Sequence, residues 1–370
     1  MYGDDARVKI AVLLSGGVDS STALVSLKEK HPQAEITAYY LKIWLEDELA
    51  SLGSCPWEED MEYAREVCGM TDIPLKVVSL QREYWDRVVS YTISELKAGR
   101  TPSPDIFCNQ RIKFGAFLDR VGESFDKVAS GHYAVISEDE NGLFRIHRSP
   151  DPVKDQTYFL SHLSQEQAAI AMFPIGGMLK SDVRMLAEKW DIPAKSRKDS
   201  QGICFLGKIK YTDFVRFYMG DKEGDILEAD TGRKLGIHKG TWFYTIGQRS
   251  GLGLSGGPWY VVKKNMEENI VTVAGSMEAA AVSRNQFTVV NPNWISGRPE
   301  LPARVTLKLR HGPKLIGATV RALADSFTQA ENGKERLEIE MDESDRGVAP
   351  GQFAVLYDGD VCLGGAMVED

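Results

Sequence analysis

Short apolar runs alternate with helix-spaced apolar residues along the first part of the chain. The runs predict strands at 10–14, 36–41, 75–79 and 128–129. Apolar residues three or four positions apart predict a helix that begins at Val18 and two more that cover 58–70 and 81–97. Strands that alternate with helices form parallel βαβ units. We therefore predict a doubly wound parallel sheet, the α/β fold class, for this part.

The pattern changes after residue 208. Glycine becomes frequent and short strand-like pieces alternate with turns up to about residue 281. From about residue 283 the apolar period is two: Ala303, Val305, Leu307 and Leu309 alternate with polar residues. This period is typical of strands with one buried face. We predict three domains: an α/β domain at 1–208, a small β-rich central domain at 209–281, and an antiparallel β-barrel at 282–370.

The stretch SGGVDSS at 15–21 joins the first predicted strand to the first predicted helix. Its glycines let the backbone approach a ligand, and the free N–H groups of the helix start bind anions. It is neither a Walker loop, because the lysine is absent, nor a dinucleotide fingerprint. The string resembles the PP-loop of ATP pyrophosphatases, which cleave ATP between the α and β phosphates. SGHY at 130–133 follows another strand, so both segments should meet at one sheet edge.

The charge and composition of the chain limit the classes of partner that it could bind. The chain has a net charge of −9, which argues mildly against nucleic acid, although binding needs only a local basic face. Basic clusters occur, among them 195–198 and 308–314, and each is more often a solvated surface. No apolar run of 18 residues suggests a membrane span, and the N-terminal residues lack a secretory apolar segment. We expect a cytoplasmic protein with no membrane partner.

Two of the five cysteines lie in contexts that suit chemistry. The odd number and the lack of a C-x-x-C pair argue against a disulfide framework or a zinc site. Cys108 follows Pro102 and Pro104 in a predicted helix capped by Asp105, where the helix start, Arg111 and Lys113 would favour the thiolate. Cys204 lies two positions after Gly202, in a polar segment that is predicted to form a mobile loop. Cys68 and Cys362 read as buried apolar residues.

Further strings occur in a fixed order with SGGVDSS. They are GRTPSPDIFCNQRIKFGAF, SGHY, KDQTYFL, KDSQGICF, GQRSGLG, PWYVV, APGQFAVLY and CLGG. In this order they resemble the tRNA-specific 2-thiouridylase family over essentially the whole chain. The resemblance implies a PP-loop domain, a small central domain and a C-terminal β-barrel, as the pattern itself suggests.

The resemblance also implies a reaction. It would be the ATP-dependent 2-thiolation of the wobble uridine of lysine, glutamate and glutamine tRNAs, with Mg²⁺ bound alongside ATP. Cys204 would carry a persulfide loaded by a sulfur relay protein or a cysteine desulfurase. Cys108 would be the nucleophile and Asp105 the acid/base. Cys108 would either release sulfide from the persulfide or resolve a transient disulfide with Cys204 after direct transfer.

The remaining site residues follow from the resemblance, motif by motif. Those implied for ATP are Leu13, Leu14, Ser15, Gly16, Gly17, Val18, Asp19, Ser20, Leu41 and Gly131. Those implied for tRNA are Ser103, Pro104 and Asp105 at the flipped base, and His132, Lys154, Asp155, Gln156, Arg310, His311 and Gln352 elsewhere. The chain departs from the family pattern at Ser103, commonly asparagine, at Leu41, commonly methionine, and at His311, commonly aromatic.

Two other functions remain open from the sequence. One is a different PP-loop enzyme, such as a lysidine or argininosuccinate synthetase, which needs no paired cysteines. The other is an RNA-binding module without catalysis, against which the intact SGGVDSS argues. The insert at 47–57 resembles versions from photosynthetic lineages and implies a plastid location if a transit peptide has been removed.

Overall fold

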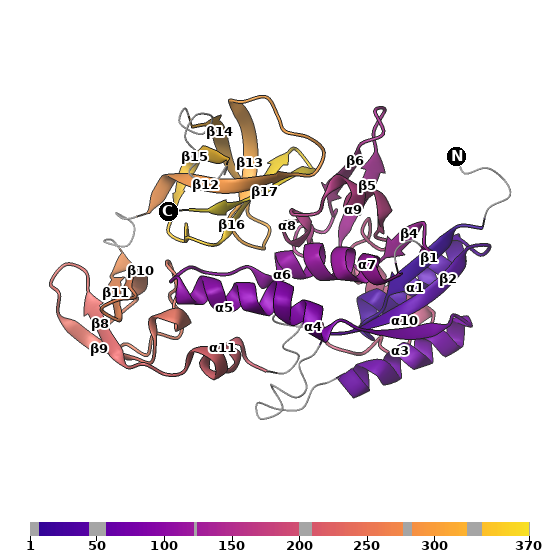
Figure 1. Cartoon of the computed structure of the whole chain (residues 1–370), viewed down its shortest axis with the longest axis horizontal. Coiled ribbons are helices and arrows are strands. Elements are labelled where there is room, and N and C mark those ends of the chain that lie inside the picture. The colour runs from indigo at the N-terminus through magenta and orange to yellow at the C-terminus, as the bar shows by residue number, and fades with distance from the viewer. Residues whose placement is uncertain are drawn as a thin grey trace.

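The computed structural model describes residues 7–43, 57–121, 124–199, 209–276, 283–323 and 335–369. Cys55, Cys204 and all of the insert at 47–57 except Trp57 lie outside these ranges, so the predictions that fall on them have no structural counterpart. Figure 1 shows the α/β part at the right, the barrel at the upper left and the central part at the lower left. Among the described residues, no helix is both long and apolar enough to cross a bilayer.

A five-stranded sheet organises the α/β part. Its order is β3-β2-β1-β4-β7 and every neighbouring pair is parallel. The strands are β1 (Lys9–Leu13), β2 (Glu35–Lys42), β3 (Leu75–Ser79), β4 (Lys127–Ala129) and β7 (Ala171–Met172). The chain leaves central β1 toward β2 on one side and returns to β4 on the other. Ligands bind at such a reversal, at the carboxyl ends of the strands.

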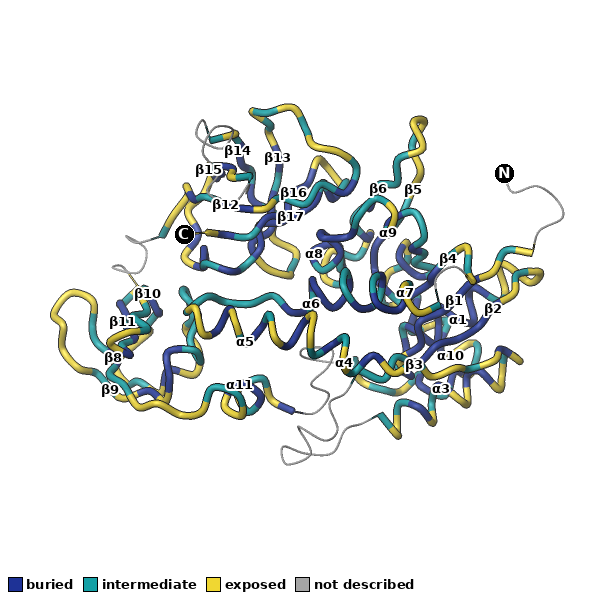
Figure 2. Tube along the Cα trace, viewed as in Figure 1, coloured by how far each residue is buried: buried dark blue, intermediate teal, exposed yellow. Residues whose placement is uncertain are grey.

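Helices cover both faces of this sheet, as predicted for a doubly wound fold. Ile10, Val12 and Leu14 pack with α1 (Val18–Lys30), α3 (Trp57–Thr71) and α10 (Lys180–Lys189). Ala11 and Leu13 face the opposite core, which the other helices supply. Those helices are α4 (Gln81–Tyr84), η2 (Trp85–Val89), α5 (Ser90–Lys97), α6 (Pro104–Phe107), η3 (Cys108–Ala116), α7 (Phe117–Val121), α8 (Thr157–Leu160) and α9 (Gln165–Ile170). Figure 2 shows buried residues along β1 and exposed residues on the outer side of α3.

Two local predictions about helix starts have different outcomes. The capping box at Ser164 is confirmed, because its hydroxyl accepts from the Gln167 N–H and the Gln167 side chain accepts from the Ser164 N–H. The prediction that Asp105 caps its helix is wrong. Ser103 is the N-cap, and Pro104 occupies the first helical position, where its missing N–H costs no hydrogen bond.

The central part is built on a four-stranded sheet of order β10-β11-β8-β9. It follows α11 (Tyr211–Met219), which packs beside α5, and it contains the short helix η5 (Thr241–Phe243). Its strands are β8 (Gly224–Glu228), β9 (Lys234–His238), β10 (Tyr260–Asn265) and β11 (Ile270–Ala274). The predicted β-rich character of this part is confirmed.

The C-terminal part is a closed six-stranded barrel, which confirms the predicted antiparallel β-barrel. Its order is β12-β15-β14-β13-β16-β17, and β12 also pairs with β17. The strands are β12 (Arg284–Trp294), β13 (Ala303–Lys308), β14 (Ile316–Ala322), β15 (Arg336–Asp345), β16 (Phe353–Asp358) and β17 (Val361–Val368). Val305, Leu307 and Ile339 lie in the barrel core. Closure leaves no free sheet edge within the barrel.

One hairpin of the α/β part was not predicted and joins the barrel. It consists of β5 (Ala134–Glu138) and β6 (Phe144–Arg148). Strand β6 pairs with β17, with Cys362 opposite Ile146. Backbone hydrogen bonds therefore connect the SGHY segment, which leads into β5, to the barrel.

Candidate functional site

The loop of SGGVDSS is held open toward the carboxyl end of β1. Gly17 is the N-cap of α1 and no side chain caps the helix, so the first N–H groups stay available to a ligand. The Ser20 hydroxyl accepts from the Ser15 N–H at 3.2 Å, and the Ser15 and Ser20 hydroxyls lie 3.1 Å apart. Gly16 has a φ of +70°, and a Cβ there would lie 2.2 Å from the Asp60 carbonyl oxygen. Only glycine fits this position.

A cavity of about 330 Å³ opens at this loop. Eight of the ten residues predicted for ATP line it: Leu13, Leu14, Ser15, Gly17, Asp19, Ser20, Leu41 and Gly131. Gly16 and Val18 do not line it. Gly16 forms the turn behind the loop, and Val18 is buried in the core beneath α1. Cys108 lies in the wall of the same cavity, so a nucleotide seated on the loop would lie close to the thiol.

The segment 130–133 closes the cavity from β4. A Cβ on Gly131 would lie 2.8 Å from the Ser20 nitrogen. The Tyr133 hydroxyl donates to Asp19 Oδ1 at 2.8 Å, and Lys180 Nζ donates to the same oxygen at 2.6 Å. Asp19 is thereby fixed at the start of α1.

His132 lines this first cavity rather than an outer surface. Its Nδ1 lies 2.7 Å from the Ser130 hydroxyl. Burial, reinforced by the charge of Lys113, lowers the pKa of His132 well below its usual value. The ring is therefore neutral at physiological pH.

Cys108 and Asp105 face different cavities although they lie on one continuous helix. Cys108 is 1% exposed and begins the π-helical segment η3, just beyond the first turn that we predicted for it. Lys113 lines its cavity. Arg111, predicted as a second cation for the thiolate, points elsewhere: it lies 3.6 Å from the Phe107 ring centroid and donates to the Arg87 carbonyl at 2.9 Å. Asp105 lines a second cavity.

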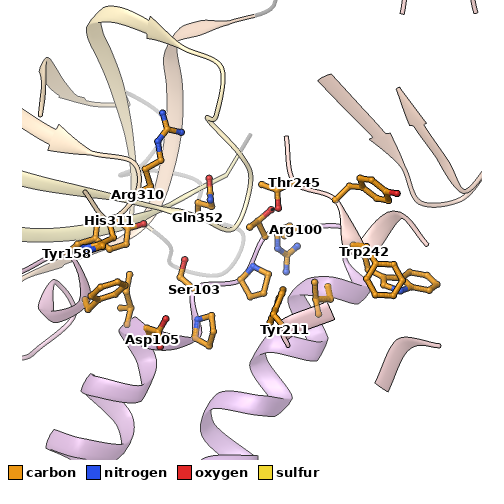
Figure 3. Close-up of a pocket in the computed structure, with 18 residues that line it drawn as sticks. Arg100, Ser103, Asp105, Tyr158, Tyr211, Trp242, Thr245, Arg310, His311 and Gln352 are labelled. Atoms are coloured by element: carbon orange, nitrogen blue, oxygen red, sulfur yellow. Dashed lines mark hydrogen bonds between the residues drawn. The ribbon is translucent and has the colours of Figure 1, made fainter. Parts of the chain in front are cut away.

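The second cavity, of about 270 Å³, lies between the three parts of the chain. Figure 3 shows Ser103 and Asp105 facing Arg310, His311 and Gln352 across it. Six residues predicted for tRNA gather here: Ser103, Pro104, Asp105, Arg310, His311 and Gln352. Aromatic side chains supply much of the wall, among them Tyr158, Phe159, Tyr211 and Trp242. Aromatic rings beside hydrogen-bonding groups suit an unstacked base.

The three residues of the KDQ segment at 154–156 do not lie on one common surface. Lys154 pairs with Asp199, and Gln156 lines the first cavity, where its Oε1 accepts from the Tyr133 N–H at 3.0 Å. Asp155 is 0% exposed and lies 2.6 Å from Lys308 Nζ. In this arrangement the Asp155 carboxylate is enclosed between the α/β part and the barrel and presents no surface to tRNA, so its contact with tRNA stays a prediction that requires this ion pair to open.

Two charged residues that line the first cavity, Asp60 and Arg197, were not predicted to have any role there, and neither was Lys180, which contacts Asp19 from outside the lining. Arg197 belongs to the basic cluster 195–198, which the sequence could not distinguish from a solvated surface. In the structure its Nη1 donates to the Gly16 carbonyl at 2.9 Å and its Nη2 lies 2.8 Å from Asp60. No local pattern could have signalled contacts across such sequence separations.

The Gly131→Ala variant tests the contact between 130–133 and α1. Its methyl group would meet backbone atoms of Asp19 and Ser20 at 2.8–3.0 Å, so one segment must shift. We expect the KM for ATP to rise about tenfold and stability to fall by about 1–3 kcal/mol. Gly177→Ala is the control, because its nearest neighbour lies 3.9 Å away. Equal KM values for the two variants would contradict this role of Gly131.

Three family models match consecutive parts of the chain. They are described as the tRNA methyl transferase HUP domain at residues 8–208, the tRNA methyl transferase PRC-barrel domain at 212–275, and the aminomethyltransferase beta-barrel domain at 284–368.

Curated relatives match over almost their whole length. The tRNA-specific 2-thiouridylase MnmA of Parabacteroides distasonis is 43% identical over 369 residues, covering 98% of this chain and 99% of the relative. The tRNA-specific 2-thiouridylase MnmA 1 of Bacteroides thetaiotaomicron is 43% identical, covering 96% and 98%. The MnmA of Porphyromonas gingivalis is 42% identical, covering 97% and 98%. All three relatives come from bacteria, and none supports the plastid location.

Proposed function

Because the chain belongs to the tRNA-specific 2-thiouridylase family, we propose that it is a tRNA-uridine 2-sulfurtransferase that uses ATP. The observation that carries this proposal is the shared cavity of SGGVDSS and Cys108. The family-model descriptions name a methyl transfer. That reaction does not require a loop that resembles the PP-loop of ATP pyrophosphatases beside a thiol. The domain division would be 1–208, 209–281 and 282–370, with the β5–β6 hairpin attached to the barrel.

The first step is adenylation of the wobble uridine. The first cavity would hold ATP, with the phosphates at the start of α1 and Mg²⁺ bound to them. The uridine O2 would attack the α phosphate, and pyrophosphate would leave with the electron pair of the broken bond. The oxygen at C2 then becomes part of a good leaving group, AMP. The enclosed, partly apolar walls at Leu13, Leu41 and Ile112 would exclude water from the adenylate.

The second step is sulfur transfer. A persulfide on Cys204, loaded by a sulfur relay protein or a cysteine desulfurase, would supply the sulfur. In one route its terminal sulfur attacks C2 and displaces AMP, and the Cys108 thiolate then attacks Cys204 Sγ. In the other, Cys108 attacks the persulfide first and hydrosulfide displaces AMP. Both routes leave a Cys108–Cys204 disulfide, which an external thiol must reduce.

Binding of tRNA would use the second cavity and the surfaces next to it. Ser103, Pro104 and Asp105 would contact the extruded base, and Arg310, His311 and Gln352 would contact the anticodon arm. The His311 and Phe159 rings are tilted by 30° with centroids 4.8 Å apart, and either ring could stack against a base. Lys154 would contact phosphate once it leaves Asp199, and His132 and Gln156 would contact the substrate from the first cavity. Asp105 would act as the acid/base for the uridine.

A direct assay tests this function. The protein is incubated with unmodified glutamate tRNA, ATP, Mg²⁺, a thiol reductant and a cysteine desulfurase with cysteine, and nucleosides are analysed by mass spectrometry. We expect 2-thiouridine with the wild type and none with Cys204→Ser. Absence of product with the wild type, or normal product with Cys204→Ser, would overturn the proposal.

A further inference from the structure

The first cavity has a cationic side chain that the loop sequence itself does not supply. SGGVDSS offers backbone N–H groups and hydroxyls but no cationic side chain, unlike a Walker loop with its lysine. The described residues that line the cavity include four charged ones: Asp19, Asp60, Lys113 and Arg197. Lys113 lies on η3 and its charge acts on His132. Of the two cations that line the cavity, Arg197 is the one that contacts the loop; Lys180 also reaches the loop, at Asp19, but does not line the cavity.

Arg197 is anchored through its backbone, and its guanidinium crosses the loop. Its carbonyl accepts from Arg184 Nη1 at 2.8 Å. Its Nη1 donates to the Gly16 carbonyl at 2.9 Å, and its carbon Cζ lies 4.5 Å from the centroid of the Tyr63 ring. The side chain is 21% exposed, so a ligand in the cavity can reach it.

Asp60 forms an ion pair with this guanidinium. Its Oδ1 lies 2.8 Å from Arg197 Nη2, and both residues line the cavity. Glu59 Oε1 is a second, longer partner at 3.8 Å from the same nitrogen. An arginine held by separate carboxylate oxygens can exchange them for phosphate oxygens, which it binds in a bidentate manner. A triphosphate carries more negative charge than one carboxylate and would compete well for this group.

We propose that Arg197 binds the β and γ phosphates of ATP and stabilises the departing pyrophosphate, with Asp60 holding it until the nucleotide arrives. This inference rests on the proposed function and extends it to the leaving group. In adenylation a bond forms between the uridine O2 and the α phosphorus. The bond from that phosphorus to the oxygen bridging to the β phosphorus breaks, and pyrophosphate keeps the electron pair. The Arg197 N–H groups donate to the charge that develops there.

Equilibrium binding of two probes tests the assignment. α,β-Methylene-ATP contains the β and γ phosphates and resists cleavage, whereas AMP lacks them. With Arg197→Gln in the full chain and Mg²⁺ present, we expect affinity for the analogue to fall about 10- to 100-fold, the equivalent of one charged hydrogen-bonding group. Affinity for AMP should change less than about twofold. Arg197→Lys should recover part of the loss, and Asp60→Asn should tighten binding of the analogue by about twofold or more.

Arg304→Gln is the matched control. Arg304 forms an exposed ion pair with Asp342 on the barrel, remote from the cavity, and its replacement should leave both affinities unchanged. Equal weakening of AMP and analogue in Arg197→Gln would show that Arg197 only supports the loop, and would overturn the inference. Unchanged affinity for the analogue would overturn it as well. If the wild type makes 2-thiouridine and either of these binding results is found, only the inference about Arg197 is wrong. If the wild type makes no 2-thiouridine, the proposed function itself is wrong.

Discussion

Replacing Cys108 by serine is expected to abolish 2-thiouridine formation while ATP-dependent adenylation of tRNA continues. Cys108 lies in the wall of the cavity that would hold the adenylate, and both routes of sulfur transfer require its thiolate to attack a sulfur of Cys204. A serine hydroxyl cannot perform that exchange, because it is far less acidic and less nucleophilic toward sulfur. We expect the loss to be about 10³-fold or more. Quantification of 2-thiouridine, together with pyrophosphate release in the presence of tRNA, checks both parts.

Cys68→Ala is the control for this variant. Cys68 is a free thiol on α3, packed in the core beneath the sheet, and desolvation by burial raises its pKa to about 11. A thiol of that kind stays protonated and inert at neutral pH. Thiolation by Cys68→Ala should equal that of the wild type, apart from any loss of folded protein. If Cys108→Ser thiolates normally, or Cys68→Ala is as inactive as Cys108→Ser, the assignment of Cys108 is wrong.

Replacing Lys308 by methionine should destabilise the docking of the barrel by about 3–5 kcal/mol, the usual cost of leaving a buried charge unpaired. The side chains of Lys308 and Asp155 are each 0% exposed, with Nζ 2.6 Å from Oδ2. Arg148 remains 3.3 Å from the same carboxylate oxygen, but it is partly exposed. Thermal unfolding and hydrogen exchange of β6 and β17, the strands that join the two parts, measure the effect.

A second substitution tests the cause of that loss. Lys308→Met combined with Asp155→Asn removes the buried charge and should recover more than half of the lost stability. Lys314→Met is the control: it removes an exposed pair with Glu343 and should cost about 0–1 kcal/mol. A double variant no more stable than Lys308→Met would show that packing, and not the unpaired carboxylate, explains the loss.

The Lys308–Asp155 ion pair should make the stability of the folded protein depend on pH. Burial alone would raise the pKa of Asp155, but the hydrogen bond and charge of Lys308 outweigh it and hold that pKa below its usual value. A carboxyl with a depressed pKa in the folded state contributes stability above its unfolded pKa of about 4 and loses it as the pH falls through the folded value. Wild-type stability should therefore fall in acid more steeply than that of the double variant.

The elements themselves were predictable because their signals are local. The strand β1, the glycine turn at Gly16 and the start of α1 follow one another in sequence, and hydrophobic periodicity with turn chemistry is enough to predict them. The barrel strands were predictable for the same reason, since the alternation of apolar and polar residues at 303–309 requires only that one face of the strand be buried. The π-helical segments were not predictable, because they extend the same helical pattern without a break.

Alternation correctly placed Lys308 outside the barrel core but could not reveal what covers it. Its partner Asp155 lies 153 positions away, and only docking of the α/β part against the barrel turns an apparently solvated lysine into a buried one. The hairpin β5–β6 was missed for a related reason. Its pairing partner β17 lies more than 200 positions later, so nothing near β6 in sequence indicates that its edge is covered.

The sequence by itself determined the order of the strands and helices and the position of the glycine loop, and it marked Cys108 and Cys204 as candidate reactive thiols, because each of these signals depends on residues within a turn or two of one another. Only the tertiary structure decided which residues share a cavity. It placed Cys108 with SGGVDSS but Asp105 with Arg310, and it enclosed Asp155 while bringing Arg197 across the loop. Such groupings depend on packing between distant segments, where burial and charge pairing select the partners.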